Sequence, residues 1–228
     1  MGHLEALRRR VLARLAEWEA AGLKRSLRPP SGIDLSSNDY LGLATHPRLV
    51  RRLAEAVHAY GCGATASRLL RGHREIFTEV ERRFAAFKRT EAALYFASGY
   101  AANLGVLTTF LEPEDVVFSD ERNHASLIDG MRLTRARRIV FPHRDVEALA
   151  RLLRSEQSPG QKFLVTESLF SMDGDRAPLR EYAALCRETG TALIVDEAHA
   201  VGLYGERGSG LIEEMDVAED VFLSVNTA

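Results

Sequence analysis

Residues 178–199 read PLREYAALCRETGTALIVDEAH, and this stretch decides the fold class. A helical pattern covers residues 178–189, with Pro178 near its first turn and Gly190 just past its end. The short apolar run 192–196 follows and predicts a buried strand that ends at Asp196. A helix that leads into a buried strand in this way is typical of a sheet covered by helices.

The same alternation recurs through the C-terminal part of the chain, where short apolar runs are spaced 20 to 30 residues apart. Helical patterns lie between the runs, for example at 145–153, where Asp145 is a candidate N-cap. Strand, helix and strand at this spacing imply right-handed crossovers. We therefore expect an α/β fold with a mainly parallel sheet and helices on both faces. The strands are predicted at 92–96, 116–118, 138–141, 163–166, 192–196 and 221–225.

The N-terminal part of the chain is predicted to contain helices. Residues 4–18 place apolar side chains at three- and four-residue steps, which predicts an amphipathic helix. We interpret it as a helix that docks on the body of the protein. A mitochondrial presequence is the alternative, and the acidic residues Glu5 and Glu17 disfavour it. Two further helices are expected at 47–60 and 75–87, with apolar stripes that face the core.

Composition excludes several classes of protein. The 228 residues are 46% apolar and 27% charged, which is typical of a soluble globular chain. Because 30 basic and 32 acidic residues give a net charge of −2, we expect no nucleic acid and no membrane surface as partner. Cys62 and Cys186 lie far apart without metal-ligand spacing, so we expect neither a disulfide nor a metal site. The sequence shows no membrane span and no signal-peptide pattern, which predicts a cytoplasmic location.

Two motifs match nucleotide sites in their letters but not in their context. GCGATA at 61–66 fits the dinucleotide pattern GxGxxA, but it follows a predicted helix instead of a strand. DEAH at 196–199 fits a helicase ATPase, but the sequence contains no phosphate loop of the form GxxxxGK[ST]. Both readings are therefore disfavoured.

Polar residues directly follow several predicted strands, and in open parallel sheets ligands bind beyond these carboxyl ends. Together they match what pyridoxal 5'-phosphate (PLP) requires. The segment SGY at 98–100 opens a helix and offers backbone N–H groups to a phosphate. Asp196 suits a pyridine nitrogen, and His124 suits the face of the ring. Ser171 and His199 suit its phenolic oxygen. Each residue alone also fits a structural role as a cap, a turn or a packed histidine, but their joint appearance favours a cofactor site.

Five motifs follow one another along the chain: SNDYLGL at 37–43, SGYAAN at 98–103, NHAS at 123–126, FSMDGD at 170–175 and DEAHAVG at 196–202. In this order they resemble the α-oxoamine synthases, which join an amino acid to an acyl-CoA and release carbon dioxide and CoA. The resemblance covers about 22–227 and implies the large domain of a fold-type-I PLP-dependent transferase. The segment 61–72 is most similar to the members that join alanine to pimeloyl-CoA in biotin biosynthesis. Glycine C-acetyltransferase activity is the alternative.

The resemblance also implies roles for single residues. His124, Asp196 and His199 are the catalytic residues that it implies. Arg25, Asn38 and His124 are implied to bind the substrates. The segment 61–63 is implied to lie at the site of a neighbouring subunit, so a homodimer is expected. The implied PLP-binding residues are Ser98, Gly99, Tyr100, His124, Ser171, Asp196, His199 and Thr227.

The Schiff-base lysine of the family has no counterpart in the sequence. In the family it follows a threonine, at a position that falls just beyond Ala228. None of the three lysines, Lys24, Lys88 and Lys162, lies at a matching position. The chain as written is therefore expected to be inactive, because a covalent nucleophile cannot be replaced by its neighbours. A non-catalytic partner subunit that lacks the lysine is the alternative.

The resemblance further implies a domain division and a specificity question. We expect an N-terminal helix and arm at 1–45 and a PLP-binding large domain at 46–228, incomplete at its C-terminal end, with the family's small C-terminal domain absent. Phe77 stands where the family often has a histidine, which bears on the acyl chain that is accepted. An aminotransferase or a lyase on the same fold is a further alternative.

Overall fold

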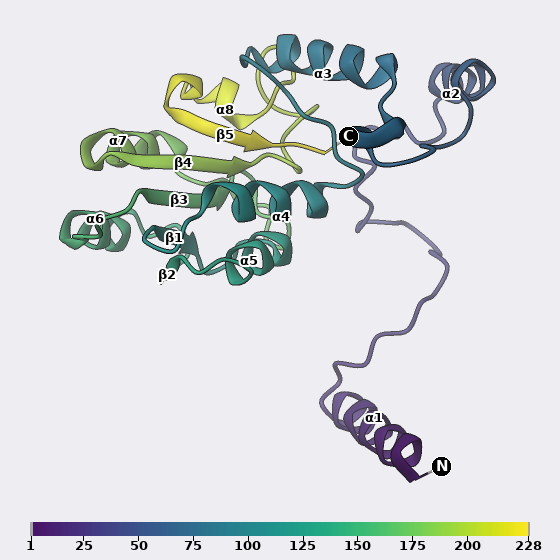
Figure 1. The fold of residues 1–228 in the computed structure, drawn as a ribbon, viewed down its shortest axis with the longest axis horizontal. Helices are drawn as coiled ribbons and strands as arrows, with labels where there is room; N and C mark the ends of the chain where they lie inside the picture. Colours follow the sequence, from purple (N-terminus) through teal and green to yellow (C-terminus); the bar gives the residue numbers. More distant parts are fainter. Residues whose placement is uncertain (1, 228) are drawn as a thin grey trace. The chain divides into compact units, whose positions relative to one another are not determined.

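The computed structural model describes residues 2–227. The chain divides into two compact units, Met1–Gly61 and Cys62–Ala228, and each is described by itself. The first unit contains the helices α1 (Gly2–Ala20) and α2 (Pro47–Tyr60), joined by turns and irregular backbone. The second unit contains the sheet and the remaining helices (Figure 1).

Five parallel strands form one sheet in the order β2-β1-β3-β4-β5. Each strand coincides with a predicted one, and the expected α/β fold is confirmed. From β1 the chain crosses to β2 on one side and then returns past β1 to β3 on the other side, and such a switch point opens a crevice at the carboxyl ends of the strands. The strands are β1 (Val116–Asp120), β2 (Arg137–Phe141), β3 (Lys162–Glu167), β4 (Thr191–Asp196) and β5 (Val221–Val225).

Helices in the second unit begin and end where local chemistry favours it. The predicted N-cap of α6 is confirmed, because the Asp145 carboxylate accepts a hydrogen bond from the backbone N–H of Ala148 at 2.8 Å. Gly190 ends α7 in the left-handed region, at φ 64°, as predicted for a residue without a Cβ. The helices are α3 (Glu75–Lys88), α4 (Gly99–Phe110), α5 (Ala125–Arg132), α6 (Val146–Ser155), α7 (Leu179–Thr189) and α8 (Leu211–Glu214), with a π-helical turn at Arg68–Gly72 and a 3₁₀ turn at Ala218–Asp220.

The core has two layers because alternate residues of each strand point to opposite faces of the sheet. Phe118 and Leu193 belong to the layer that packs against α6 and α7. Val117 and Ile194 belong to the layer that packs against α4 and α5. All four side chains are buried. In Figure 1, α4 lies beside α5 and α6 lies beside α7, so both faces of the sheet are covered, as expected.

The predicted strand at 92–96 is wrong. This segment is extended, but it has no hydrogen-bonded partner strand among the described residues. Leu94 and Tyr95 are more than half exposed. The backbone N–H of Tyr95 donates to Glu81 Oε1 at 2.8 Å, so a side chain of α3 occupies a group that a ladder would otherwise use. An apolar run alone does not make a strand, because the ladder needs a neighbour.

The apolar stripes expected on two helices are not core. On α2, Leu49, Val50, Leu53 and Val57 are all at least 42% exposed, and the helix has no buried residue. On α3, Val80 is 40% exposed and the phenylalanines of the stripe are only half-buried. No helix in the described part of the chain is long and apolar enough to cross a membrane.

Candidate active site

Acidic side chains lie at the carboxyl ends of three neighbouring strands. Asp120 ends β1, Glu167 ends β3 and Asp196 ends β4. All three are buried, and Glu167 lies directly opposite Asp196 in the parallel register. The predicted cofactor residue Asp196 therefore shares its end of the sheet with two further carboxyl groups.

Asp196 is held by two hydrogen-bond donors. The side-chain amide Nδ2 of Asn103, on α4, donates to Oδ2 at 2.7 Å. The backbone N–H of Ala198 donates to Oδ1 at 2.8 Å. Donors on both oxygens are the arrangement that an ionised carboxylate requires. Asn103 therefore supports Asp196, a role that the sequence motif SGYAAN did not indicate.

The same amide connects Asp196 to His124. Asn103 Nδ2 also lies 2.9 Å from Ser126 Oγ, and that hydroxyl lies 2.7 Å from His124 Nδ1. The backbone N–H of Ser126 donates to His124 Nδ1 at 3.2 Å, so this nitrogen is an acceptor. The neutral imidazole then carries its proton on Nε2. The structure thus brings two of the predicted cofactor residues into one network.

The start of α4 lies against the end of the chain. Ser98 is the N-cap, and its hydroxyl accepts a hydrogen bond from the backbone N–H of Ala101 at 3.2 Å. A Cβ added at Gly99 would lie 2.3 Å from Cγ2 of Thr227. The Thr227 hydroxyl donates to the carbonyl of Ala198 at 3.2 Å. Only glycine fits at position 99 in this arrangement, and the predicted phosphate residues Gly99 and Thr227 are in contact.

Tyr100 points to an acidic neighbour. Its hydroxyl donates to Asp129 Oδ2, on α5, at 2.5 Å. This hydrogen bond raises the pKa of Tyr100 and lowers the pKa of Asp129. The ring of Tyr100 also makes an edge contact with His124, with 6.4 Å between ring centroids. The phenol group is therefore engaged by a side chain, whereas the backbone of residues 99 and 100 forms the first turn of the helix.

Ser171 and His199 lie on the loops that follow β3 and β4. The backbone N–H of Ser171 donates to Glu167 Oε2 at 3.3 Å, and its side chain is exposed. Burial lowers the pKa of His199, Asp196 opposes that shift, and His124 adds to it. His199 is therefore neutral over a wider pH range than a free histidine.

The loop that carries Ser171 is anchored by a histidine that sequence reasoning missed. His143 lies between two carboxylates: Nδ1 is 2.8 Å from Asp120 Oδ1, and Nε2 is 2.8 Å from Asp175 Oδ2. Burial lowers the pKa of His143, but the hydrogen bonds to both carboxylates outweigh burial and the pKa is raised. We call the set His143, Asp120 and Asp175 the histidine clamp. It joins the end of β1 to the loop after β3.

A buried ion pair supports the loop after β4 and was also missed. Lys88, at the end of α3, donates from Nζ to Glu197 Oε2 at 2.6 Å and to the carbonyl of Ser209 at 2.5 Å. The other oxygen of Glu197 accepts from the backbone N–H of Ile212 at 3.0 Å. Glu197 is the direct neighbour of Asp196, so this pair fixes the backbone at the predicted cofactor site.

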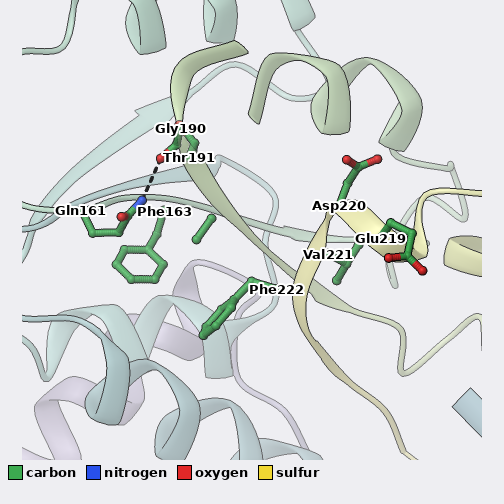
Figure 2. A pocket seen from close by; sticks show the side chains of 9 residues that line it. Gln161, Phe163, Gly190, Thr191, Glu219, Asp220, Val221 and Phe222 are labelled. Carbon is green, nitrogen blue, oxygen red and sulfur yellow. Dashed lines mark hydrogen bonds between the residues drawn. The ribbon is translucent and has the colours of Figure 1, made fainter. Parts of the chain in front are cut away.

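The hollow shown in Figure 2 lies at the opposite end of the sheet. Gln161, Thr191 and Val221 line it at the amino ends of β3, β4 and β5. Gln161 Nε2 donates to the carbonyl of Gly190 at 2.8 Å (Figure 2). The hollow contains none of the predicted cofactor residues. No group of histidine, cysteine and acidic side chains that could hold a metal ion occurs among the described residues.

With this geometry in place, comparison with known proteins identifies the family. A profile of the family described as aminotransferase class I and II matches residues 30–227. The chain belongs to the aminotransferase class I and II family. Asp120, Glu167 and Asp196 lie at the carboxyl ends of their strands, where open α/β sheets bind ligands.

Three relatives show which members of the aminotransferase class I and II family the chain is similar to. The 8-amino-7-oxononanoate synthase of Geobacter sulfurreducens is 46% identical over 232 residues, covering 96% of the chain and 59% of that protein. The serine palmitoyltransferase of Sphingomonas wittichii matches with a TM-score of 0.82 at 36% identity, covering 85% of the chain and 48% of that one. A high-resolution structure of SPT with PLP matches with a TM-score of 0.81 at 34% identity, again covering 85% and 48%. The predicted resemblance is confirmed.

The chain spans only 48–59% of the length of these relatives. Two predicted substrate residues of this aminotransferase family member, Arg25 and Asn38, lie in the first compact unit. There, Asn38 Oδ1 accepts a hydrogen bond from the Tyr40 hydroxyl at 3.5 Å. Their assignment stays a prediction.

In the second unit, Phe77 stacks with Tyr95 at 5.9 Å between ring centroids, with the Arg68 guanidinium 5.1 Å from the Phe77 ring.

Proposed function

We propose that the protein is a PLP-dependent acyltransferase of the α-oxoamine synthase type. The reaction is the decarboxylative condensation of an amino acid with an acyl-CoA, and alanine with pimeloyl-CoA is the proposed substrate pair. The observation that carries the proposal is the buried Asp196 carboxylate, held by Asn103 and joined through Ser126 to His124. Similarity to the 8-amino-7-oxononanoate synthase of Geobacter sulfurreducens supports the choice of substrates.

The residues present fit PLP. Asp196 is buried and has two donors but no cationic partner among the described residues, which suits a protonated ring nitrogen. The side chain of Thr227 lies so close to Gly99 that a Cβ there would clash, so glycine at this position lets the Thr227 side chain approach the backbone at the start of α4. A helix N-terminus beside a hydroxyl group suits a phosphate group. His124 has its Nδ1 occupied as a hydrogen-bond acceptor, which leaves Nε2 as the nitrogen that can donate.

The roles that the family resemblance implies are proposed for these residues. The backbone at Ser98, Gly99 and Tyr100 and the hydroxyl of Thr227 bind the phosphate. His124 stacks on the ring, and Asp196 binds the ring nitrogen. Ser171 and His199 contact the phenolic oxygen. Arg25 and Asn38 bind the acyl substrate and the amino acid carboxylate, respectively.

PLP supplies an electron sink that makes an α-carbon acidic and a β-keto acid easy to decarboxylate. The chain's own residues prepare for this chemistry in defined ways. Asp196 supplies the negative charge that keeps a ring nitrogen protonated, and Asn103 keeps that carboxylate in place. His124 has its Nδ1 occupied, so its Nε2 is the nitrogen that orients a substrate group or moves a proton.

The proposal extends to partners and organisation. We propose a homodimer in the cytoplasm, with residues 61–63 of one subunit near the site of the other, and a division of the chain into an arm at 1–45 and a large domain from residue 46. The exposed apolar side chains of α2, which the first unit itself does not bury, support a further protein surface against this helix.

The test is release of CoA by the protein expressed from its complete gene and supplied with PLP, because the Schiff-base lysine of the family has no counterpart in residues 1–228. Alanine with pimeloyl-CoA is compared with glycine and acetyl-CoA, and the amino ketone product is identified by mass spectrometry. A clear preference for alanine and pimeloyl-CoA supports the proposal. A preference for glycine and acetyl-CoA assigns glycine C-acetyltransferase activity instead. Turnover without any CoA thioester contradicts the acyltransferase class.

A further inference from the structure

Glu167 is a buried acidic residue at the carboxyl end of the sheet to which the proposed function gives no role. It ends β3, is 2% exposed, and lies opposite Asp196 in the β3–β4 register. Side chains at paired positions of neighbouring parallel strands point to the same face, so the two carboxyl groups are neighbours. Two carboxyl groups that share a buried site do not both ionise easily.

The hydrogen bonds distinguish the two carboxyl groups. Asp196 accepts from Asn103 and from the backbone N–H of Ala198, one donor for each oxygen. Glu167 Oε2 accepts a long hydrogen bond, 3.3 Å from the backbone N–H of Ser171, and the backbone N–H of His124 also acts on this carboxyl group. Oε1 of Glu167 is buried and has no hydrogen-bond partner among the described residues. A negative charge is therefore better accommodated on Asp196 than on Glu167.

The charged groups around Glu167 also disfavour a negative charge on its carboxyl group. Asp196 on β4 and Asp120 on β1 are the two charged side chains that act on it, and both are acidic. No cationic side chain forms an ion pair with Glu167 in the described part of the chain. The other titratable groups at this end of the sheet are His124, whose Nδ1 accepts from Ser126, and His199, whose pKa is lowered.

We propose that Glu167 is a proton-holding positioning residue: of the Glu167–Asp196 pair, Glu167 carries the proton and Asp196 carries the charge. Burial raises the pKa of Glu167 to about 7, and the charge of Asp196 adds to the effect, while the backbone N–H groups of His124 and Ser171 oppose it. Those two N–H groups belong to the residues proposed to contact the ring and its phenolic oxygen. Loss of the proton makes Glu167 a stronger acceptor for the backbone N–H groups of His124 and Ser171. The charge of Glu167 is therefore coupled to the loops that carry these two residues.

The test is a pH titration of protein labelled with ¹³C at the glutamate side-chain carboxyl, followed by NMR from about pH 5 to about pH 9. Wild-type protein is expected to show one glutamate carboxyl that titrates near neutral pH. Glu167→Gln keeps the shape and is expected to lose that signal, whereas Glu147→Gln, at an exposed position on α6, is expected to keep it. If no glutamate titrates near neutral pH, or if the signal survives Glu167→Gln, the proposal is overturned.

A second variant keeps the proposal testable if Glu167→Gln does not fold. Asp196→Asn removes the neighbouring charge and is expected to shift the titration of Glu167 to lower pH. An unchanged midpoint contradicts the shared-proton arrangement. The titration uses protein without ligand, so it is independent of the proposed function. Absence of PLP binding at every pH, with the Glu167 titration present, would count against the function and leave the proton assignment intact.

Discussion

The ammonium group of Lys88 lies 2.6 Å from Glu197 Oε2, and both side chains are buried although 109 residues separate them in sequence. The pair ties the end of α3 to the loop that follows Asp196. A buried charge that loses its partner is costly, whereas an exposed pair contributes little. The relationship therefore bears on the stability of the second unit as well as on the geometry of the site.

Lys88→Met is expected to lower the free energy of unfolding by about 3–5 kcal/mol, because Glu197 is left as an unpaired buried charge. Urea unfolding followed by circular dichroism measures this change. Lys24→Met breaks an exposed ion pair with Glu19 and is the control, with an expected cost below about 1 kcal/mol. Adding Glu197→Gln to Lys88→Met is expected to recover part of the loss. Equal costs for the two lysine variants would refute this assignment.

Gly99→Ala is expected to weaken PLP binding and to destabilise the protein by about 1–3 kcal/mol, because its Cβ meets Cγ2 of Thr227 at 2.3 Å. The double variant Gly99→Ala, Thr227→Ser removes that methyl group while keeping the hydroxyl. We expect the double variant to regain stability, as measured by thermal unfolding. If the serine variant brings no recovery, the contact between residues 99 and 227 does not limit the site.

The histidine clamp predicts a pH dependence of stability. The pKa of His143 is raised in the folded protein from its ordinary value of 6.5, so protonation stabilises the fold. This stabilisation is complete below about pH 6.5 and is lost as the pH rises through the higher folded value. Unfolding free energies of wild type and His143→Gln, measured across this range, are expected to differ most at low pH and to converge above it. A constant difference would mean that His143 is not charged in the clamp.

In the protein expressed from its complete gene, Asp196→Ala is expected to lower turnover by about 100-fold or more, because a ring nitrogen bound there loses the charge that keeps it protonated. The assay is CoA release with alanine and pimeloyl-CoA. Glu147→Ala, at an exposed position on α6, is the control and is expected to keep full activity. Synthase activity retained in Asp196→Ala would remove Asp196 from its proposed role.

Local patterns predicted those parts of the fold that local chemistry determines. The strands β1, β3 and β4 were predictable because their apolar runs are buried, and Asp145 was predictable because a cap contacts only the next turn. The strands β2 and β5 have one buried residue each, and their apolar character and spacing were enough to predict them. Residues 92–96 have the same apolar character, yet no partner strand lies beside them among the described residues. A strand depends on its neighbour, and composition does not contain that information.

In the candidate site, too, the residues that were predictable are those that the local sequence marks. Asp196 was predictable because it is the first polar residue after a buried strand, at an edge where ligands bind. Lys88, His143 and Glu167 were missed because their partners lie on other elements, and no spacing in the sequence reports those contacts. Membership of the aminotransferase class I and II family was predictable from motifs. The side chains that hold the motif residues in place were found only in the structure.

The hydrogen bond from Asn103 to Asp196 joins residues that are 93 positions apart, and it forms across α4 and β4. Contacts of such high sequence separation are made late in folding, because a long loop must close before they bring any stabilisation. The carboxylate of Asp196 therefore acquires this side-chain donor only once α4 and β4 have come together. A nascent chain that has not yet completed β4 lacks this contact, so cofactor binding is expected to follow, and not to guide, the folding of this unit.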